Sequence, residues 1–577
     1  MTLTRKTCPF SLHLAALTCI LAFASSTAVR QRLPHVAENI AEPMLKTRQQ
    51  PSTIPITGAS SGNGVQPRLE IRQLQQNADQ WNLYMLGLQR MQQANQSDPL
   101  SWYQIAGIHG RPYVPWDNVQ MVQGGNGGYC THISTLFLSW HRPYLALFEQ
   151  VLYSSVTEVA NEFPSGAIRQ RYTEAAMSFR IPYWDWAVAP PEGNSTMPDS
   201  ISSPTVTVTA PSNINSSTVS TQIPNPLYSY AFHPLVPSDF YWQDHPQFAN
   251  WTETLRWPAN LDVNAASQDE LAVSTIDKNR PNLRDRVYNL MTSATNYTTF
   301  STEMWAANGA ISGYDSLESI HDVIHQVTGG NLGHMFWLDY SAFDPIFWLH
   351  HANIDRLFAM WQVINPDTYL EPALQVYPTF AYNTSIIQDG NSRLAPFHTN
   401  SNGEFWTSYM ARSVDAMAYS YPELWNNATN QAASASDIRT SINNLYGNGT
   451  YGSQPAKRDA NGGSAEPPRQ EYMATIRAEK NGLGYPFSVY IFVGHIDEQD
   501  PLQWARDPNL VGSQAFFASS DFTVNGVMSS GMVPLTTTLA AKMQNQELEG
   551  LEVEQVSEYL EQNLGWRIVK VRARFNF

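Results

Sequence analysis

The chain has few cysteines and few basic residues, and both shortages restrict what it can be. Only 3 Cys occur among 577 residues, and Cys8 and Cys19 lie in an N-terminal segment that we expect to be removed. Cys130 would then be alone in the mature protein, which excludes a disulfide framework. With 34 Lys and Arg against 50 Asp and Glu, the formal charge is −16. That balance argues against a nucleic-acid partner, which requires a basic face.

Apolar runs long enough to cross a membrane are also missing. The longest candidate, residues 12–23, follows Arg5 and Lys6 and precedes small residues that end at Ala28. A membrane span needs about 20 apolar residues, whereas this pattern is typical of a secretory signal. We therefore expect a signal peptide at 1–28, a pro-segment at 29–50 and a secreted, extracellular protein with no membrane partner.

Sequons for N-glycosylation agree with export, and none of them follows residue 450. The lack of sequons after residue 450 indicates that the last hundred residues form a different unit. The candidate sites are Asn95, Asn194, Asn215, Asn250, Asn296, Asn383, Asn427 and Asn448.

Two patterns divide the rest of the chain. Helical apolar spacing at 81–91, 136–156 and 352–361 predicts a mainly α-helical domain over 51–450, with a long surface excursion at 188–230. A linker rich in Gly and Pro follows at 451–469 and contains Lys457 and Arg458. Period-two stretches at 472–478, 486–493 and 568–575, with a helix at 553–563, then predict a smaller β-rich, sandwich-like domain over 470–577.

The histidines form two clusters. The first contains His109, His132 and His141, and the second contains His321 and His325 followed by the adjacent pair 350–351. Because His321 and His325 are four residues apart, both rings leave one face of a helix. Each cluster offers three imidazoles, a donor set that suits Cu, Zn, Fe or Ni.

Other metal sites explain the pattern less well. A zinc protease would have Glu in place of Asp322 and would not account for the first cluster. A multicopper oxidase would show His-x-His pairs, which the sequence does not contain. A single buried histidine is more often a core residue, and we take His233, His245, His334, His398 and His495 to be structural.

Several segments resemble those of the fungal tyrosinases, a type 3 copper family. These are 140–144 (Trp-His-Arg-Pro-Tyr), 182–186 (Pro-Tyr-Trp-Asp-Trp), 350–356 (His-His-Ala-Asn-Ile-Asp-Arg) and 418–421 (Ala-Tyr-Ser-Tyr). The resemblance covers roughly residues 52–577. It implies a helical-bundle catalytic domain that holds two copper ions, followed by a β-rich domain.

The resemblance also implies the ligands. His109, His132 and His141 would bind one copper, and His321, His325 and His351 the other. His351 is chosen over its neighbour because the family's third ligand lies four residues before an Asp, here Asp355. A Cys two residues before the second ligand forms a thioether in the family, which Cys130 and His132 match. The alternative for Cys130 is an inert free thiol.

The family's chemistry is the oxidation of phenols to o-quinones with O₂. Glu318 resembles the residue that holds a base water, and Asp322 stands where monophenol-hydroxylating relatives often have Asn. Met335 and Phe347 are expected to line the substrate pocket. We therefore expect a tyrosinase. A catechol oxidase restricted to o-diphenols and a haemocyanin-like O₂ carrier remain the alternatives.

The C-terminal domain of relatives lies over the copper site and inserts an aromatic ring. We expect residues 470–577 to do the same until a processing protease cuts at Lys457-Arg458 in the exposed linker. The candidates for the blocking ring are Phe516, Phe517 and Phe522.

Overall fold

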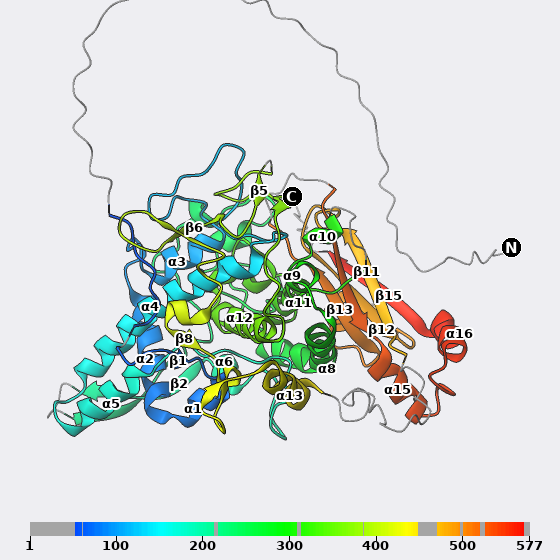
Figure 1. Ribbon diagram of the computed structural model, residues 1–577, viewed down its shortest axis with the longest axis horizontal. Coiled ribbons are helices and arrows are strands. Elements are labelled where there is room, and N and C mark those ends of the chain that lie inside the picture. Colours follow the sequence, from blue (N-terminus) through cyan, green and yellow to red (C-terminus); the bar gives the residue numbers. More distant parts are fainter. Residues whose placement is uncertain are drawn as a thin grey trace, which may run out of the picture.

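The computed structural model describes residues 52–60, 62–212, 217–307, 313–384, 386–447, 470–496, 500–519 and 526–570 (Figure 1). The expected signal peptide, pro-segment and linker pair Lys457-Arg458 lie outside these residues, as do Asn215, Asn448 and Phe522. Among the helices of the described part, none has the length and apolar character needed to cross a membrane.

Four helices make the centre of the larger domain. They are α3 (Trp102–His109), α4 (Phe137–Glu162), α11 (Leu317–Gly329) and α12 (Ile346–Ile364). Every residue of α11 is buried, as is α12 up to Trp361. Both helices carry polar side chains, and complete burial requires these to find partners inside the protein. A capping box at Ser316 begins α11, and Gly330, at φ 63°, ends it.

Other helices enclose this centre. Helix α2 (Ala78–Gln93) packs along α4, and α8 (Asp269–Ser293) packs along α11. The helices expected at 81–91, 136–156 and 352–361 are therefore confirmed, each longer than its pattern. Smaller helices at the surface are α1 (Ile71–Gln76), α5 (Ala167–Met177) and α13 (Ala435–Tyr446).

The excursion expected at 188–230 lies largely at the surface and contains a β-hairpin. Strands β2 (Thr205–Ser212) and β3 (Ser217–Pro224) pair in antiparallel register. Their alternating Thr and Val residues favour strands. The Asn82 amide on α2 binds the edge of β2, because it donates to the Thr209 carbonyl (2.7 Å) and accepts from its N–H (2.6 Å).

The described part of the C-terminal domain consists of antiparallel strands, a short helix α14 (Pro501–Trp504) and two longer helices around its own core. Strand β11 (Met473–Glu479) pairs with β14 (Met528–Pro534), and β13 (Leu510–Phe516), β12 (Phe487–Val493) and β15 (Leu564–Lys570) lie in that order. Helices α15 (Thr536–Gln544) and α16 (Val553–Asn563) lie at the outer end, whereas β13 and β14 face α8 and α11 (Figure 1). The expected β-rich domain is confirmed, although β15 begins earlier than 568.

Three of the four segments that carry the family resemblance meet at one buried carboxylate, Asp355 on α12. Its Oδ1 accepts from Arg142 Nε (2.7 Å). Its Oδ2 accepts from the hydroxyls of Tyr419 (2.5 Å) and Tyr421 (2.7 Å) and lies 3.4 Å from an Arg68 nitrogen. Burial would raise the pKa of Asp355, but the two guanidinium groups outweigh it and hold the pKa below its usual value. The network fastens α12 to α4.

Removing this charge should destabilise the fold. In Asp355→Asn the side chain keeps its size, but Arg142 is left buried without its counter-charge, which costs about 3–5 kcal/mol, whereas Arg68 keeps its pair with Glu149. Urea unfolding should show that loss. Asp79→Asn breaks the exposed Arg171–Asp79 pair and serves as the control, with an expected loss below about 1 kcal/mol. Equal midpoints for the Asp355→Asn variant and the parent would contradict the role given to the network.

Candidate metal centre

The two histidine clusters meet between the four central helices. Helix α3 ends at His109, and α4 carries His141 in its first turn. Helix α11 supplies His321 and His325 one turn apart, and α12 supplies the pair 350–351. His132 comes from the loop before α4. All these rings are buried, so the structure brings together every residue that the sequence assigned as a ligand.

The second ligand set, His321, His325 and His351 (copper B), converges in a way that calls for a cation. His321 Nδ1 donates to Asp322 Oδ1 (2.9 Å), and His325 Nδ1 donates to the Met335 carbonyl (2.8 Å). Their Nε2 atoms therefore carry lone pairs, yet these atoms lie 2.9 Å apart. His351 Nε2 lies 3.2 Å from that of His321. The lone pairs of His321 and His325 repel at this distance unless a positive ion lies between them, and His351 offers a third nitrogen beside them.

In the first ligand set, His109, His132 and His141 (copper A), hydrogen bonds from Nδ1 to backbone carbonyls again orient two of the rings. His109 Nδ1 donates to the Leu338 carbonyl (3.1 Å), and His141 Nδ1 donates to the Phe137 carbonyl (2.7 Å). The Nε2 atoms of His109 and His132 are buried and have no hydrogen-bond partner among the described residues. Backbone carbonyls fix ligand tautomers in this way in many metal sites.

Burial keeps these imidazoles neutral. It is the first cause that lowers their pKa values, neighbouring imidazoles add to it for most of the rings, and the pKa of His141 falls to about 4. A neutral imidazole is the form that binds metal. Buried nitrogen donors with no carboxylate among the expected ligands suit copper and disfavour the oxygen-seeking ions. The residues present therefore fit a copper pair.

His350 is closer to the site than the sequence indicated. Its ring stacks on that of His321 at 5.0 Å, and its donor atom lies within 4.8 Å of those of His321, His325 and His351. Neither of its nitrogens has a partner in the described structure. The sequence pattern gave no reason to place both members of the pair at the metal centre.

Cys130 lies where the thioether hypothesis requires. Its Sγ is 3.2 Å from His132 Nδ1 and 3.3 Å from His141 Nε2. Burial raises the pKa of the Cys130 thiol well above its usual value, so the thiol is protonated at neutral pH.

Glu318 is fully buried one turn before His321. Its oxygens accept from the N–H of Ile133 (2.7 Å), the hydroxyl of Thr302 (2.6 Å) and the N–H of Glu303 (3.0 Å). Burial raises the pKa of Glu318 to about 7. The carboxylate thus lies near the site but is tied to the surrounding backbone.

Asp322 has two partners on different sides. One oxygen orients His321, and the other accepts from Lys480 Nζ at 3.0 Å. Lys480 belongs to the C-terminal domain, and both side chains are fully buried. Burial raises the pKa of Asp322 to about 7, although Lys480 opposes that shift.

Phe517 is the aromatic ring that enters the site. It stacks on His325 at 4.2 Å and lies 5.5 Å from His132 and 6.0 Å from His321. Phe516, by contrast, stacks on Phe487 at 4.4 Å inside the core of the C-terminal domain, so that candidate was wrong. Strand alternation explains the difference, because successive side chains leave opposite faces.

Phe347 and Met335, which we expected to line the substrate pocket, make different contacts with the metal centre. The ring of Phe347 packs against those of His351 (4.0 Å) and His109 (4.9 Å). Met335 is fully buried and contributes its carbonyl to His325. His334 accepts from the Leu255 N–H (3.0 Å) and is structural, as expected.

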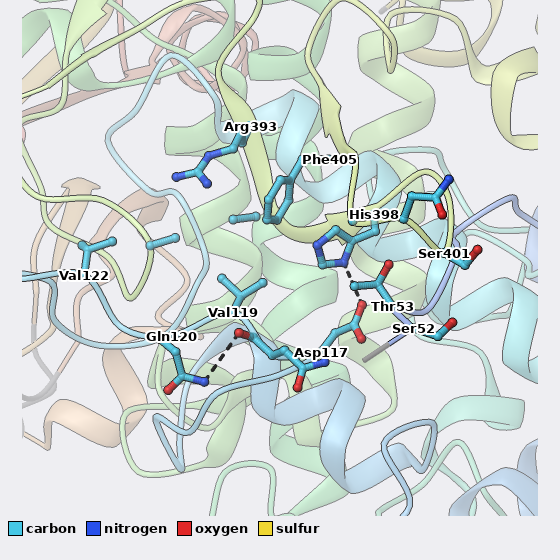
Figure 2. A pocket seen from close by; sticks show the side chains of 15 residues that line it. Ser52, Thr53, Asp117, Val119, Gln120, Val122, Arg393, His398, Ser401 and Phe405 are labelled. Carbon is cyan, nitrogen blue, oxygen red and sulfur yellow. Dashed lines mark hydrogen bonds and ion pairs between the residues drawn. The ribbon is translucent and has the colours of Figure 1, made fainter. Parts of the chain in front are cut away.

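A separate hollow of about 1030 Å³ has none of the expected metal ligands in its wall (Figure 2). Its wall includes Asp117, Arg393 and Phe405, and His398 donates to Asp117 Oδ2 at 2.7 Å. The same oxygen accepts from the Ile54 N–H (2.9 Å). His398 is therefore a structural residue that fastens the start of the domain.

Comparisons with known proteins agree with this geometry. The common central domain of tyrosinase matches residues 99–364, and the tyrosinase C-terminal domain matches 471–575. A tyrosinase of Podospora anserina is 36% identical over 87% of this chain and 97% of its own length. One of Neurospora crassa is 34% identical over 89% and 90%.

Solved structures show the same likeness. Recombinant mushroom tyrosinase superposes with a TM-score of 0.72 at 26% identity, covering 89% of this chain and 91% of that one. A pro-tyrosinase of Aspergillus oryzae gives 0.67 at 27% identity, covering 86% and 90%. The chain therefore belongs to the tyrosinase family of copper-dependent phenol oxidases.

Proposed function

We propose that the protein is a secreted tyrosinase that is made as a precursor. It converts phenols to o-quinones with O₂ at two coppers, one held by His109, His132 and His141 and the other by His321, His325 and His351. The approach of the His321 and His325 Nε2 atoms to 2.9 Å, with His351 Nε2 at 3.2 Å, supports this assignment most directly. A thioether between Cys130 and His132 would hold the His132 ring in place.

The side chains of the protein supply orientation, exclusion of water and a proton acceptor. Bound copper would supply the electron exchange with O₂ that amino acids cannot. The carbonyls of Leu338, Phe137 and Met335 hold three of the rings, and Phe347 closes the apolar wall behind them. A phenol with a pKa of about 10 must lose its proton to bind a metal. We propose Glu318 as the acceptor of that proton.

The metal assignment predicts copper content. The parent should bind two coppers per chain, and His321→Ala should lose at least the copper B ion because its Nε2 lies between those of His325 and His351. Elemental analysis after copper loading measures this. The exposed His233 offers a control, since His233→Ala should retain both ions. A His321→Ala protein that keeps two coppers and full activity would remove the assignment.

The C-terminal domain is proposed to keep the precursor latent. Phe517 fills the space beside His325 that a phenol would need. A tethered group competes at high effective concentration, and cutting the linker converts it to a weaker, separate partner. Cleavage after Arg458 should therefore activate the enzyme.

Latency predicts the activity of variants in the uncut chain. Phe517→Ala should speed catechol oxidation by roughly tenfold or more at equal copper loading, because the ring no longer competes with substrate. Trp566→Ala removes an exposed aromatic of the same domain and should change nothing. An Arg458→Ala precursor should stay slow after protease treatment. If that precursor is as fast as the cut enzyme, the domain does not inhibit.

Substrate range decides between tyrosinase and its alternatives. A tyrosinase hydroxylates tyrosine and oxidises catechol, a catechol oxidase does only the second, and an O₂ carrier does neither. Spectroscopic detection of quinone from both compounds with the cut enzyme separates the three. We expect both reactions; the stacking of Phe517 on His325 supports the entry of an aromatic ring, which both reactions need. Oxidation of catechol alone would identify a catechol oxidase.

A further inference from the structure

Two carboxylates beside the metal centre belong to the catalytic domain but have their partners in the covering domain. Glu303, between α9 (Tyr297–Ser301) and α10 (Met304–Ala307), accepts from Lys480 Nζ (3.2 Å), Ser529 Oγ (2.6 Å) and Gln514 Nε2 (3.4 Å). All three donors come from the C-terminal domain. Glu303 and Lys480 are fully buried.

Asp322 is arranged in the same way. Its Oδ1 is used by His321 within the catalytic domain. Its Oδ2 accepts from Lys480 Nζ (3.0 Å) and from the backbone N–H of Phe517 (3.4 Å). Both donors to this oxygen therefore leave when the covering domain leaves.

The covalent structure of Phe517 gives this contact a meaning. In any phenylalanine the backbone nitrogen is joined to the ring through two carbons, which is the skeleton of 2-phenylethylamine. The Phe517 ring stacks on His325, and its nitrogen reaches Asp322 Oδ2. The covering domain thus places an aromatic ring in the site and a nitrogen, three bonds from that ring, against a carboxylate.

Lys480 adds the positive charge that an amide nitrogen lacks. Its ammonium lies on the same Asp322 oxygen and also on Glu303. Burial would lower the pKa of Lys480, but the carboxylates outweigh it and raise the pKa. The nearby Arg286 is paired with Asp315 at 2.6 Å instead. Loss of the covering domain therefore removes the cation that is paired with Glu303 and Asp322.

We propose that Glu303 and Asp322 form the subsite for a substrate ammonium group once the covering domain has gone. The favoured substrates are phenols or catechols with a cationic aminoethyl chain, and phenols with a carboxylate at that position are disfavoured. The ring takes the place of Phe517, and the ammonium takes the place shared by the Phe517 nitrogen and Lys480 Nζ. This inference rests on the proposed function, because it names the substrates of the same site.

The alternative is that Lys480 only fastens the two domains together. In that case Glu303 and Asp322 would have no effect on substrates of the cut enzyme. Charge-assisted hydrogen bonds at a partly enclosed site change affinity several-fold, and they weaken as salt increases. Substrate charge therefore distinguishes the two roles.

The experiment uses the full chain, loaded with copper and then cut in the linker. We measure kcat/KM for dopamine, for neutral 4-methylcatechol and for 3-(3,4-dihydroxyphenyl)propionate. At low salt, kcat/KM for dopamine should exceed kcat/KM for the propionate by about tenfold or more. Glu303→Gln should reduce that ratio roughly fivefold, mainly by raising KM for dopamine. Glu404→Gln removes a charge from the loop between β6 (Arg393–His398) and β7 (Phe405–Thr407) and is the control.

A second measurement does not depend on the oxidation of dopamine itself. 2-Phenylethylamine and 3-phenylpropionate, which have no phenol group, are compared as competitive inhibitors of 4-methylcatechol oxidation. The amine should inhibit at lower concentration in the parent, and Glu303→Gln should abolish the difference. Equal inhibition by both in the parent, or dopamine-to-propionate ratios unchanged in Glu303→Gln, would overturn the subsite. No oxidation of 4-methylcatechol at all would instead refute the proposed function.

Discussion

The buried ion pair between Arg142 and Asp355 sets the position of the two halves of the metal centre relative to each other. Arg142 directly follows His141 on α4, and Asp355 lies one turn after His351 on α12. A contact of 2.7 Å between them holds these helices so that the rings of His141 and His351 stack at 4.5 Å. Two buried charges must remain paired, since separating them costs several kcal/mol. The helices therefore cannot shift without breaking the network.

The side chains of the metal centre itself, by contrast, are buried as neutral groups and not as paired charges. Its imidazoles are neutral because water cannot reach them, and each Nδ1 that has a carbonyl or carboxylate partner leaves its Nε2 facing inward. Three buried carboxyl groups, those of Glu303, Glu318 and Asp322, lie together around Lys480 on one flank of the centre. The covering domain meets that flank with Lys480, so its own charge is as important to the fit as its aromatic ring.

Local patterns made much of this predictable from the sequence. The spacing of His321 and His325 requires one helical face, and the apolar periods of α4 and α12 identify the helices that hold His141 and His351. Long-range packing was not predictable. Glu303 and Lys480 are separated by 177 residues, and neither stands in a motif. The proximity of His350 depends on helix rotation, and the β2–β3 hairpin depends on one amide, Asn82, that caps its edge.

The same contacts explain how one domain can close the site firmly and still be removed. A ring stacked on an imidazole contributes about 0.5–1.5 kcal/mol beyond its buried area, which alone would compete poorly with abundant substrate. Lys480 changes the balance, because partial opening would leave Glu303 and Asp322 in an apolar setting without their cation. In the latency that we propose, intermediate positions are therefore unfavourable, and release should carry the domain fully away so that water reaches these charges. Cutting the linker favours the released state by removing the tether, without altering any contact at the site.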